Sequence, residues 1–225
     1  MPAIGITGGI STGKTSFGRA LRAIVPDATF FDADVAAREL ADRDPEVRGL
    51  IEQEFGGAVY SASGDLNRAA IRSIVFADAG KKRALEQILH PRIRRQWSLE
   101  AESRRNSTDL FFADIPLLYE TGGETLCDRV VVVACSPGVQ LERLVARMVA
   151  MEGRAPASPA GNIEASRELR PPARLAAQQM IDSQMPLTDK IARADHVVWN
   201  NGGKDVLAEQ ARLLVNFWQR LGTKN

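Results

Sequence analysis

The sequence predicts an α/β fold in which a parallel sheet carries helices on both of its faces. Short apolar runs alternate with segments of helical periodicity along the chain, which is the pattern of such a fold. The run 28–31 shows no alternation of polar and apolar residues, as is typical of a strand covered on both faces. A glycine-rich turn follows the first apolar run, and carboxylates follow two later runs. Ligands of parallel sheets bind at these strand ends.

The composition is that of an ordinary globular protein with one sizeable core. Of the 225 residues, 44% are apolar and 25% are charged, and the formal net charge is +1. The near-zero charge excludes the broad basic field of a general nucleic-acid-binding protein. Cys127 and Cys135 flank an apolar run, which favours reduced core thiols over a disulfide. Without a leader or an apolar stretch approaching ~18 residues, the sequence predicts a cytoplasmic protein that does not contact membranes.

The first half of the chain begins with a strand, a loop and a helix. An apolar segment at 3–7 precedes the glycine-rich turn, and apolar residues recur at helical spacing over 14–24. The second predicted strand, 28–31, ends in Asp32-Ala33-Asp34. The pattern over 35–106 is mostly helical, which indicates an inserted helical region. Breaks in that region are expected at Asp44-Pro45, at the glycine-containing stretch 56–64 and at Pro91.

The second half of the chain again alternates between strands and helices. Strands are predicted at 110–113, 130–134 and 196–199, and helices at 139–151 and 173–183. The segment 152–172, rich in Pro, Ala, Gly, Ser and Arg, has the composition of a mobile surface loop. A final helix is expected to dock against the sheet through one apolar stripe, formed by Leu207, Ala211, Leu214, Trp218 and Leu221.

The strongest functional signal is the segment GGISTGKT at 8–15. It matches G-x-x-x-x-G-K-[ST] and lies between a predicted strand and a predicted helix, as a phosphate-binding loop requires. Its backbone amides would surround phosphates, Lys14 would reach the β and γ oxygens, and the Thr15 hydroxyl would join a magnesium shell. The expected contacts with ATP are Gly9, Ser11, Thr12, Gly13, Lys14, Thr15 and Ser16. The α/β fold is therefore predicted to be a sheet of the P-loop NTPase type.

Carboxylates at two strand ends are candidates for the chemistry. Asp34 stands where a base can orient an attacking hydroxyl and accept its proton, and it is the preferred candidate. The alternative is that one residue of the pair Asp32 and Asp34 caps the helix that follows. Asp114 could hold a magnesium-bound water, or it could be an ordinary turn residue at the end of a strand.

Several arginines are candidates for contacts with phosphate groups. Arg143 and Arg147 share one face of a predicted helix, where they would either clamp transferring phosphate or remain solvated. The run HPRIRRQW at 90–97 is of a kind that also occurs in nucleic-acid-binding proteins. It is a single run in a chain without a repeated basic face, so a local site for an anionic acceptor is favoured. His196 has no such neighbours and is interpreted as structural.

With these residues in place, the chain resembles the dephospho-coenzyme A kinase family over almost its whole length. Several separate segments agree with the family pattern, and they follow one another in the same order. The segments are GITGGISTGKT, DADVAAREL, GDLNRAAIRSIVF, ILHPRIR, DIPLLYE, QLERLVARM, SQMPLTDKIARADHVV and NNGG.

The resemblance implies an ATP- and Mg²⁺-dependent transferase of coenzyme A biosynthesis. The enzyme would move the γ-phosphoryl group of ATP to the 3′-hydroxyl of dephospho-CoA, its small-molecule partner, as a monomer or a small homo-oligomer. The implied parts are a nucleotide-binding core at 1–34, 108–142 and 195–225, a helical acceptor domain at 35–107, and a lid with an extended loop at 143–194.

The resemblance also implies roles for individual residues. Asp34 would be the base, Lys14 and Arg147 would be further catalytic residues, with Arg147 in the lid, and Asn200 would lie near adenine. The acceptor side would be lined by Asp32, Arg38, Arg68, His90 and Arg94.

Three positions and one segment depart from the family pattern. Ser11 replaces a glycine, so its amide is kept but its side chain has to point away from the phosphates. Asn67 stands where an Asp is common, and Trp199 stands where an Asp usually precedes Asn200. The loop 152–172 is longer than the family's own.

Other functions explain less of the sequence. A P-loop kinase for a nucleoside or nucleoside monophosphate is the main rival, and only ILHPRIR and PLLYE argue against it. A guanine-nucleotide switch would carry an Asn-Lys-x-Asp run, which the sequence lacks. A catalytically inactive scaffold would lack a residue that the reaction requires. The candidate residues Lys14, Thr15, Asp34 and Asp114 are all present.

Overall fold

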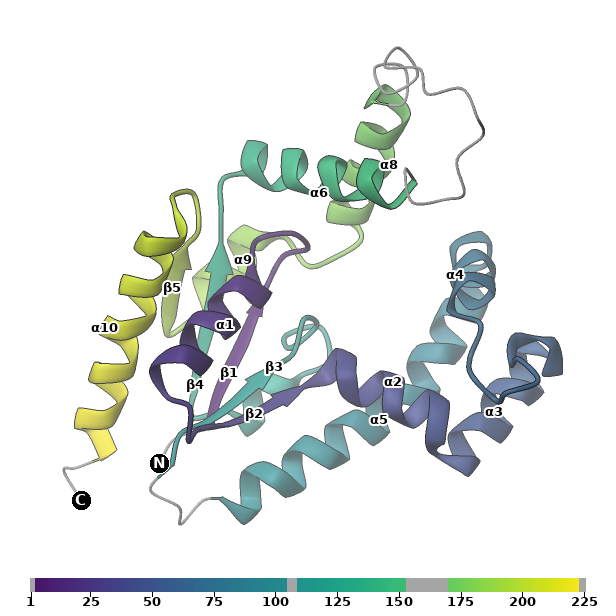
Figure 1. Cartoon of the computed structure of the whole chain (residues 1–225), viewed down its shortest axis with the longest axis horizontal. Coiled ribbons are helices and arrows are strands. Elements are labelled where there is room, and N and C mark those ends of the chain that lie inside the picture. The colour runs from purple at the N-terminus through teal and green to yellow at the C-terminus, as the bar shows by residue number, and fades with distance from the viewer. Residues whose placement is uncertain (1–2, 105–108, 153–169, 223–225) are drawn as a thin grey trace. The chain divides into compact units, whose positions relative to one another are not determined.

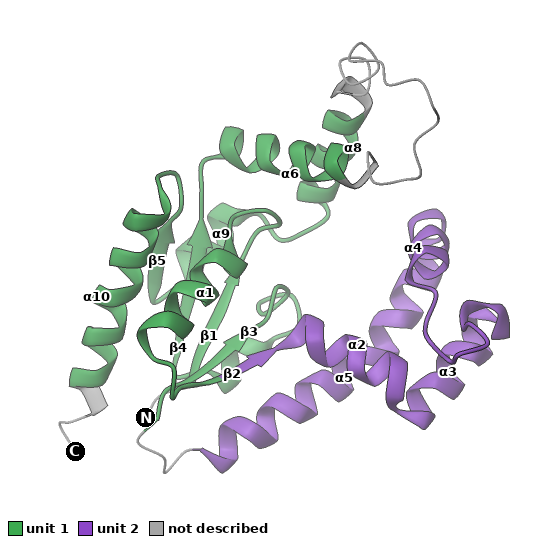
Figure 2. Ribbon diagram, viewed as in Figure 1, with its two compact units in different colours: residues 1–29, 107–225 green, residues 30–106 purple. Residues whose placement is uncertain are grey.

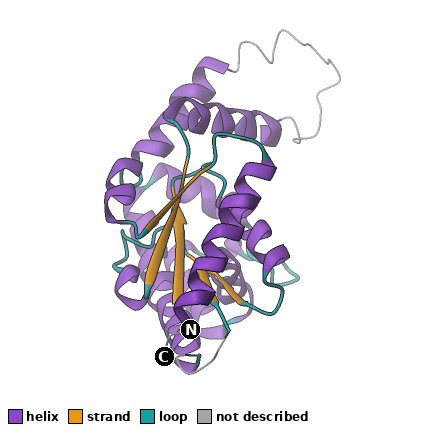
Figure 3. Ribbon diagram, turned by 90° about the vertical axis from the view of Figure 1, so that its left-hand side faces the viewer, coloured by secondary structure: helices purple, strands orange, loops and turns teal. Residues whose placement is uncertain are grey.

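A five-stranded sheet assembles segments that are far apart in the chain. The structure is a computed structural model that describes residues 3–104, 109–152 and 170–222. The sheet order is β2-β3-β1-β4-β5 (Figure 1). The strands are β1 (Ala3–Gly8), β2 (Thr29–Asp32), β3 (Phe111–Asp114), β4 (Arg129–Ala134) and β5 (His196–Trp199). β1 pairs in parallel with β3 and β4, and β4 pairs in parallel with β5 (Figure 3). The predicted α/β class with a parallel sheet flanked by helices is confirmed.

The chain forms two compact units, residues 1–29 with 107–225 and residues 30–106 (Figure 2). Among its described residues, the first unit has the helices α1 (Lys14–Ile24), η2 (Gly123–Leu126), α6 (Pro137–Glu152), α8 (Arg170–Asp182), α9 (Leu187–Arg193) and α10 (Lys204–Gly222). Those of the second unit are α2 (Ala33–Arg43), α3 (Pro45–Phe55), η1 (Gly57–Val59), α4 (Arg68–Ala77) and α5 (Ala79–Ser103).

The core of the first unit lies between the sheet and α10. Val131, Val132 and Val133 of β4 are fully buried, as expected for a strand covered on both faces. Helix α10 packs against α1 and β5, which confirms that the last helix docks onto this layer. The edge of the Trp218 ring meets the ring of Phe112 at a centroid distance of 5.8 Å. Burying such aromatic rings contributes a large part of the stability of the unit.

The apolar stripe of α10 differs from the prediction at one position. Leu207, Ala211, Val215 and Trp218 are buried, so Val215 takes the place expected for Leu214. Steps of four residues followed by a step of three keep the stripe on one face of a helix with 3.6 residues per turn. The side chain of Leu221 lies outside the described residues.

His196 is half-buried and packs against aromatic rings, in line with its structural interpretation. Its ring lies 5.4 Å from that of Phe217 and 5.8 Å from that of Trp218, both edge to face. Burial lowers the pKa of His196, because desolvation disfavours the imidazolium. The ring is therefore neutral at pH 7 and packs as an aromatic residue.

Side-chain caps set the starts of the helices in the second unit. Asp44 Oδ1 accepts from the amides of Glu46 and Val47, and Pro45 occupies the first position of α3. The predicted break at Asp44-Pro45 is confirmed. Asn67 Oδ1 accepts from the amide of Ala70 at the start of α4, so the asparagine serves here as an effective cap.

The predicted break at Pro91 is wrong, because α5 continues through this residue to Ser103. A proline inside a helix has no amide hydrogen and disturbs the carbonyls of the preceding turn. Here Arg92 Nη1 donates to the Ile88 carbonyl oxygen at 2.9 Å. The carbonyl that loses its amide partner at Pro91 is that of Gln87, four residues earlier, so the Arg92 side chain supports the next carbonyl of the same turn.

Helices α6 and α8 pack against each other beside the sheet (Figure 1). α8 begins at Arg170, earlier than predicted, because Pro171 and Pro172 fall in its first turn, where no amide hydrogen is needed. Most of the loop predicted at 152–172 lies outside the described residues. Among the described helices, none combines the length and the apolar character needed to span a membrane.

Candidate functional site

The predicted phosphate-binding loop lies between β1 and α1. Gly13 has a left-handed backbone (φ 103°) and directly precedes α1, which starts at Lys14. A Cβ at Gly13 would lie 1.9 Å from Asn200 Nδ2, so only glycine fits this position. Thr15 in the first turn is exposed, and the Ser16 amide donates to the Gly13 carbonyl at 3.0 Å.

Side chains satisfy the carbonyl groups of this loop. The Thr12 hydroxyl is buried and donates to the Gly9 carbonyl at 2.9 Å. Asn200 Nδ2 donates to the Thr12 carbonyl at 2.9 Å, and Gln140 Nε2 donates to the Ile10 carbonyl at 2.9 Å. The Thr12 side chain therefore serves the loop itself, which leaves only its backbone for a ligand.

Asn200 connects the loop to β4 and α6. It is 8% exposed, and its amide donates to the Ala134 carbonyl at 2.7 Å. Its own carbonyl accepts from Arg143 Nη1 at 2.9 Å. Arg143 is thus held by Asn200, an arrangement that neither the phosphate-clamp nor the solvated-face interpretation predicted. Arg147, one turn further along α6, is exposed.

Trp199 ends β5 with an exposed side chain. Gln210 of α10 binds both backbone groups of this residue: the Trp199 amide donates to Gln210 Oε1 at 3.0 Å, and Gln210 Nε2 donates to the Trp199 carbonyl at 2.9 Å. The strand end therefore keeps its shape through the backbone, whichever side chain stands at position 199.

Ser11 has a strained backbone. Its φ of 59° makes it the one non-glycine residue with a positive φ among those that the structure describes. A Cβ in this region crowds the backbone, which costs about 1–2 kcal/mol relative to the right-handed conformation. The glycine that the family pattern has at this position would avoid that cost.

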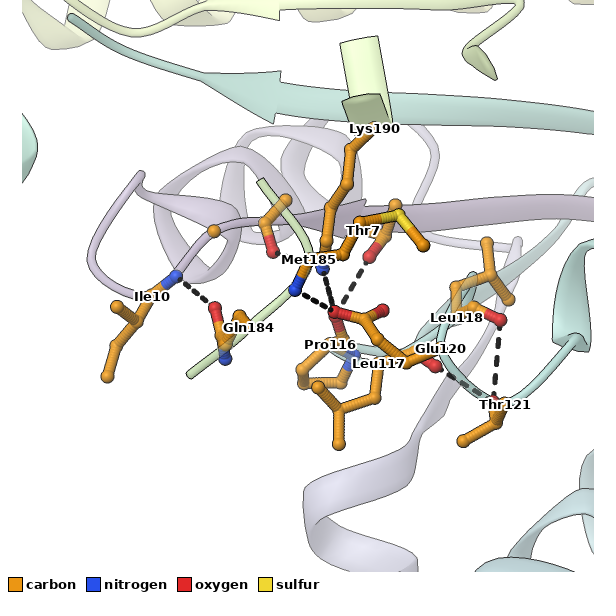
Figure 4. A network of polar contacts seen from close by, with 12 residues as sticks. Thr7, Ile10, Pro116, Leu117, Leu118, Glu120, Thr121, Gln184, Met185 and Lys190 are labelled. Atoms are coloured by element: carbon orange, nitrogen blue, oxygen red, sulfur yellow. Dashed lines mark hydrogen bonds and ion pairs between the residues drawn. The ribbon is translucent and has the colours of Figure 1, made fainter. Parts of the chain in front are cut away.

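A buried lysine links the end of β1 to the loop that holds Pro116 and Glu120 (Figure 4). Lys190 of α9 has a fully buried side chain and forms an ion pair with Glu120 at 2.8 Å. Its ammonium group also donates to the carbonyls of Pro116 at 3.2 Å and Gly8 at 3.5 Å. The Thr7 hydroxyl donates to the same Pro116 carbonyl at 3.0 Å. The end of β1, where the phosphate-binding loop starts, is therefore fixed by a buried charge with several partners.

Three titratable side chains of this unit stay protonated at neutral pH. Burial raises the pKa of Cys127 and of Tyr119 to about 12 in each case, and it raises the pKa of Cys135. The positive charge of Arg193, whose guanidinium lies 4.3 Å from the Tyr119 ring centroid, opposes the shift of that phenol. Both cysteines are free thiols, as predicted; Cys135 is buried and Cys127 is partly buried.

The proposed acceptor residues belong to the second unit. Asp32 directly precedes α2, and Asp34 lies in the first turn of this helix. Asp32 Oδ1 accepts from the amides of Asp34 at 2.9 Å and Val35 at 3.0 Å, so Asp32 is the helix cap that the sequence left open. Asp34 is exposed and has Arg38 one turn further along the same helix face. A carboxylate and a guanidinium are thus presented together to solvent.

The remaining acceptor residues lie on α4 and α5. Arg68 begins α4 and forms an ion pair with Asp42 at 2.5 Å. His90 and Arg94 share a face of α5 and are half-buried. Arg94 also has an interaction partner within the protein. The metal candidate Asp114 is the last residue of β3 and pairs with Ile6 of β1 in the sheet, and it too has a partner.

Sequence reasoning missed the side chains that support the loop. Gln140, Gln184 and Lys190 bind backbone groups of residues 8–10 from more than a hundred positions away. The quoted segments QLERLVARM and SQMPLTDKIARADHVV contained all three residues, but nothing local distinguishes a supporting glutamine from a solvated one. Their presence in shared segments was the only available signal.

Comparison with known proteins gives a consistent result. The family model described as dephospho-CoA kinase matches residues 2–170. A dephospho-CoA kinase of Anaeromyxobacter dehalogenans is 41% identical over 221 residues, which cover 96% of this chain and 92% of that protein. One of Bacillus cereus is 33% identical over 216 residues, with 96% of each chain covered.

A solved structure shows the same fold. The dephospho-CoA kinase from Campylobacter jejuni aligns with a TM-score of 0.67 at 20% identity, and the alignment covers 97% of each chain.

Replacing Ser11 by glycine should stabilise the protein. Ser11→Gly removes the Cβ from a positive-φ position, and we expect the free energy of unfolding to rise by about 0.5–1 kcal/mol after the extra freedom of glycine in the unfolded chain is subtracted. Denaturant unfolding measures this change. Ser11→Ala keeps the Cβ and should give no gain; an equal gain in both variants would show that backbone strain is not the cause.

Removing the buried ammonium group should destabilise the protein. Lys190→Met leaves Glu120 without its counter-ion and removes one donor from the carbonyls of Gly8 and Pro116, of which Pro116 keeps the Thr7 hydroxyl, so we expect a loss of about 3 kcal/mol in denaturant unfolding. Lys82→Met is the matched control, because its ion pair with Glu86 is exposed and 3.9 Å long, and it should change stability by less than about 0.5 kcal/mol. Similar losses in the two variants would contradict the importance of burial.

Proposed function

The chain belongs to the dephospho-CoA kinase family, and on this premise we propose which of its residues bind ATP, accept the proton and bind dephospho-CoA. The enzyme is an ATP-dependent kinase that transfers a phosphoryl group to an alcohol group, the reaction that produces coenzyme A from dephospho-CoA. The residue assignments rest on the segment at 8–15, which joins a strand to a helix through a loop. Side chains of the protein donate hydrogen bonds to the carbonyl groups of this loop.

The phosphates of ATP are bound by backbone amides of the loop and by Lys14. This proposal is supported by the position of Gly13 and Lys14 at the start of α1, because the free amides and the dipole of a helix N-terminus favour anions. Gly9, Ser11, Thr12 and Ser16 are assigned to the same phosphate site. Asn200 is assigned to the adenine side of the site, since its backbone and side chain fix the loop beside it.

Magnesium is proposed to bind near Thr15, with Asp114 holding one of its waters. Both residues offer oxygen, the donor that this cation prefers, and magnesium usually keeps several waters beside one or two protein ligands. No cluster of three acidic, histidine or cysteine side chains occurs among the described residues, which suits an ion held mainly by phosphates. When bound, magnesium neutralises charge on the β- and γ-phosphates.

Asp34 is proposed to accept the proton of the attacking 3′-hydroxyl. It is supported by the exposure of its carboxylate and by Asp32, which holds the first turn of α2 and thereby fixes the Asp34 backbone. Arg38, Arg68, His90 and Arg94, together with Asp32, are assigned to the acceptor. Their positive and hydrogen-bonding groups suit a substrate that carries phosphates.

The domain assignment is part of the same proposal. The core comprises 1–34, 108–142 and 195–225, the acceptor domain 35–107 and the lid 143–194, and Arg147 of the lid is assigned to the transferring phosphate. We further propose that the enzyme acts in the cytoplasm as a monomer or a small homo-oligomer, on small molecules alone.

A direct assay tests the acceptor. The purified protein is incubated with ATP, magnesium and dephospho-CoA, and ADP and coenzyme A are followed by chromatography, with AMP and adenosine as competing acceptors. We expect one coenzyme A for each ADP. Formation of ADP only with AMP or adenosine would keep the P-loop kinase and overturn the assigned acceptor.

Asp34→Asn should reduce kcat by at least about a hundredfold, because a positioned base contributes that much or more to proton transfer. ATP affinity, measured by calorimetry without acceptor, should stay within about twofold because the nucleotide contacts are assigned to other residues. Asp27→Asn, at an exposed aspartate in the turn after α1, is the control and should leave kcat unchanged. Near-normal turnover of Asp34→Asn would remove this residue from its role.

A further inference from the structure

Ile10, in the middle of the phosphate-binding loop, has both of its backbone polar groups bound by glutamines. The Ile10 amide donates to Gln184 Oε1 at 2.9 Å (Figure 4), and Gln140 Nε2 donates to the Ile10 carbonyl at 2.9 Å. An amide can only donate and a carbonyl can only accept, so the orientation of both side chains is fixed. Ile10 is therefore bound to the protein and does not offer its amide to phosphate.

The two glutamines are themselves held in place. Gln140 is 4% exposed, and a Cβ at Gly9 would lie 2.6 Å from its Nε2 atom, so the amide packs directly on the loop. Gln184 is followed by Met185, whose amide donates to Glu120 Oε1 at 3.2 Å, the carboxylate oxygen that also pairs with Lys190. These bonds fix the segment from which Gln184 reaches the loop (Figure 4).

The glutamines stand at the two chain connections of the α6–α8 pair. Gln140 lies in the first turn of α6, and Gln184 follows the end of α8 by two residues. The two helices pack against each other. The connection from β4 to α6 and the connection from α8 to α9 therefore both supply a glutamine to the same residue of the loop.

The residue after Ile10 is the strained Ser11. A positive φ in a non-glycine residue persists only where the surroundings impose it. The two hydrogen bonds on the preceding residue, from Gln140 and Gln184, supply such a constraint.

We propose that Gln140 and Gln184 are positioning residues for ATP: together they hold Ile10 and Ser11 in the loop conformation that receives the triphosphate, and they connect this conformation to α6 and α8. The inference rests on the proposed role of the loop in ATP binding. Movement of α6 and α8 would then shift the loop that contacts the phosphates, because these two side chains connect the helices to the loop.

The two hydrogen bonds differ in direction, and this difference provides the test. Glutamate has the shape of glutamine but only accepts, so Gln184→Glu keeps the bond to the Ile10 amide, whereas Gln140→Glu turns an acceptor toward the Ile10 carbonyl. Both variants add one negative charge beside the same residue. Their difference therefore isolates the hydrogen bond from the charge.

We expect Gln140→Glu to weaken ATP binding about tenfold more than Gln184→Glu does, the size expected when one buried hydrogen bond is lost. Gln184→Met removes the acceptor and should weaken ATP binding by about as much as Gln140→Met does. The dissociation constant of ATP is measured by calorimetry with magnesium, and KM is measured for both substrates. KM for dephospho-CoA should change by less than about twofold in all variants, because damage would be confined to the nucleotide site.

Equal ATP affinities of Gln140→Glu and Gln184→Glu would overturn the proposal, as would wild-type affinity in both methionine variants. A parallel rise in KM for dephospho-CoA would do the same, because it would show general misfolding instead of a positioning effect. Melting curves confirm that each variant is folded, and the pair Gln184→Met and Gln184→Glu decides the matter if changes at Gln140 prevent folding. Because ATP is titrated without an acceptor, the result does not depend on which alcohol the enzyme phosphorylates.

Discussion

The nucleotide half of this enzyme depends on one constraint: a loop outside helix and strand must satisfy its backbone carbonyls from elsewhere in the protein. Thr12 does so for Gly9 within the loop, and Gln140 and Asn200 do so for Ile10 and Thr12 from distant elements. None of these donors is charged, so they add no competing cation beside the phosphates. The glycines of the motif permit the turn, but these amides decide which conformation it takes.

The same need for hydrogen-bond donors explains why two segments that are distant in the sequence lie next to the loop. Glu120 belongs to DIPLLYE, and Met185 and Lys190 belong to SQMPLTDKIARADHVV; in the structure these residues bind one another. Burying Lys190 is unfavourable without Glu120 and the neighbouring carbonyls, so the two segments depend on each other. Segments that carry the family resemblance in the sequence therefore include partners of an internal network.

The sequence predicted the strands, the loop and the helix boundaries that local chemistry controls. The strand at 196–199 and the break at Asp44-Pro45 follow from apolar runs and from the lack of a proline amide hydrogen. The continuation of α5 through Pro91 was not predictable, because α5 packs against α2, α3 and α4, and these contacts are not visible in the local sequence. Gln140 and Gln184 were missed for the related reason that their partner, Ile10, is brought to them only by the folded sheet.

The two halves of the reaction differ in how far residues alone can identify them. Phosphates are recognised by backbone amides, which demand glycine at particular positions and leave a pattern that can be read in the sequence. An alcohol acceptor is recognised by side chains on helices, and Asp34 with Arg38, or His90 with Arg94, is a spacing that any solvated helix face can show. Backbone chemistry therefore identifies the P-loop from this chain by itself, whereas the acceptor is identified through the family to which the whole chain belongs.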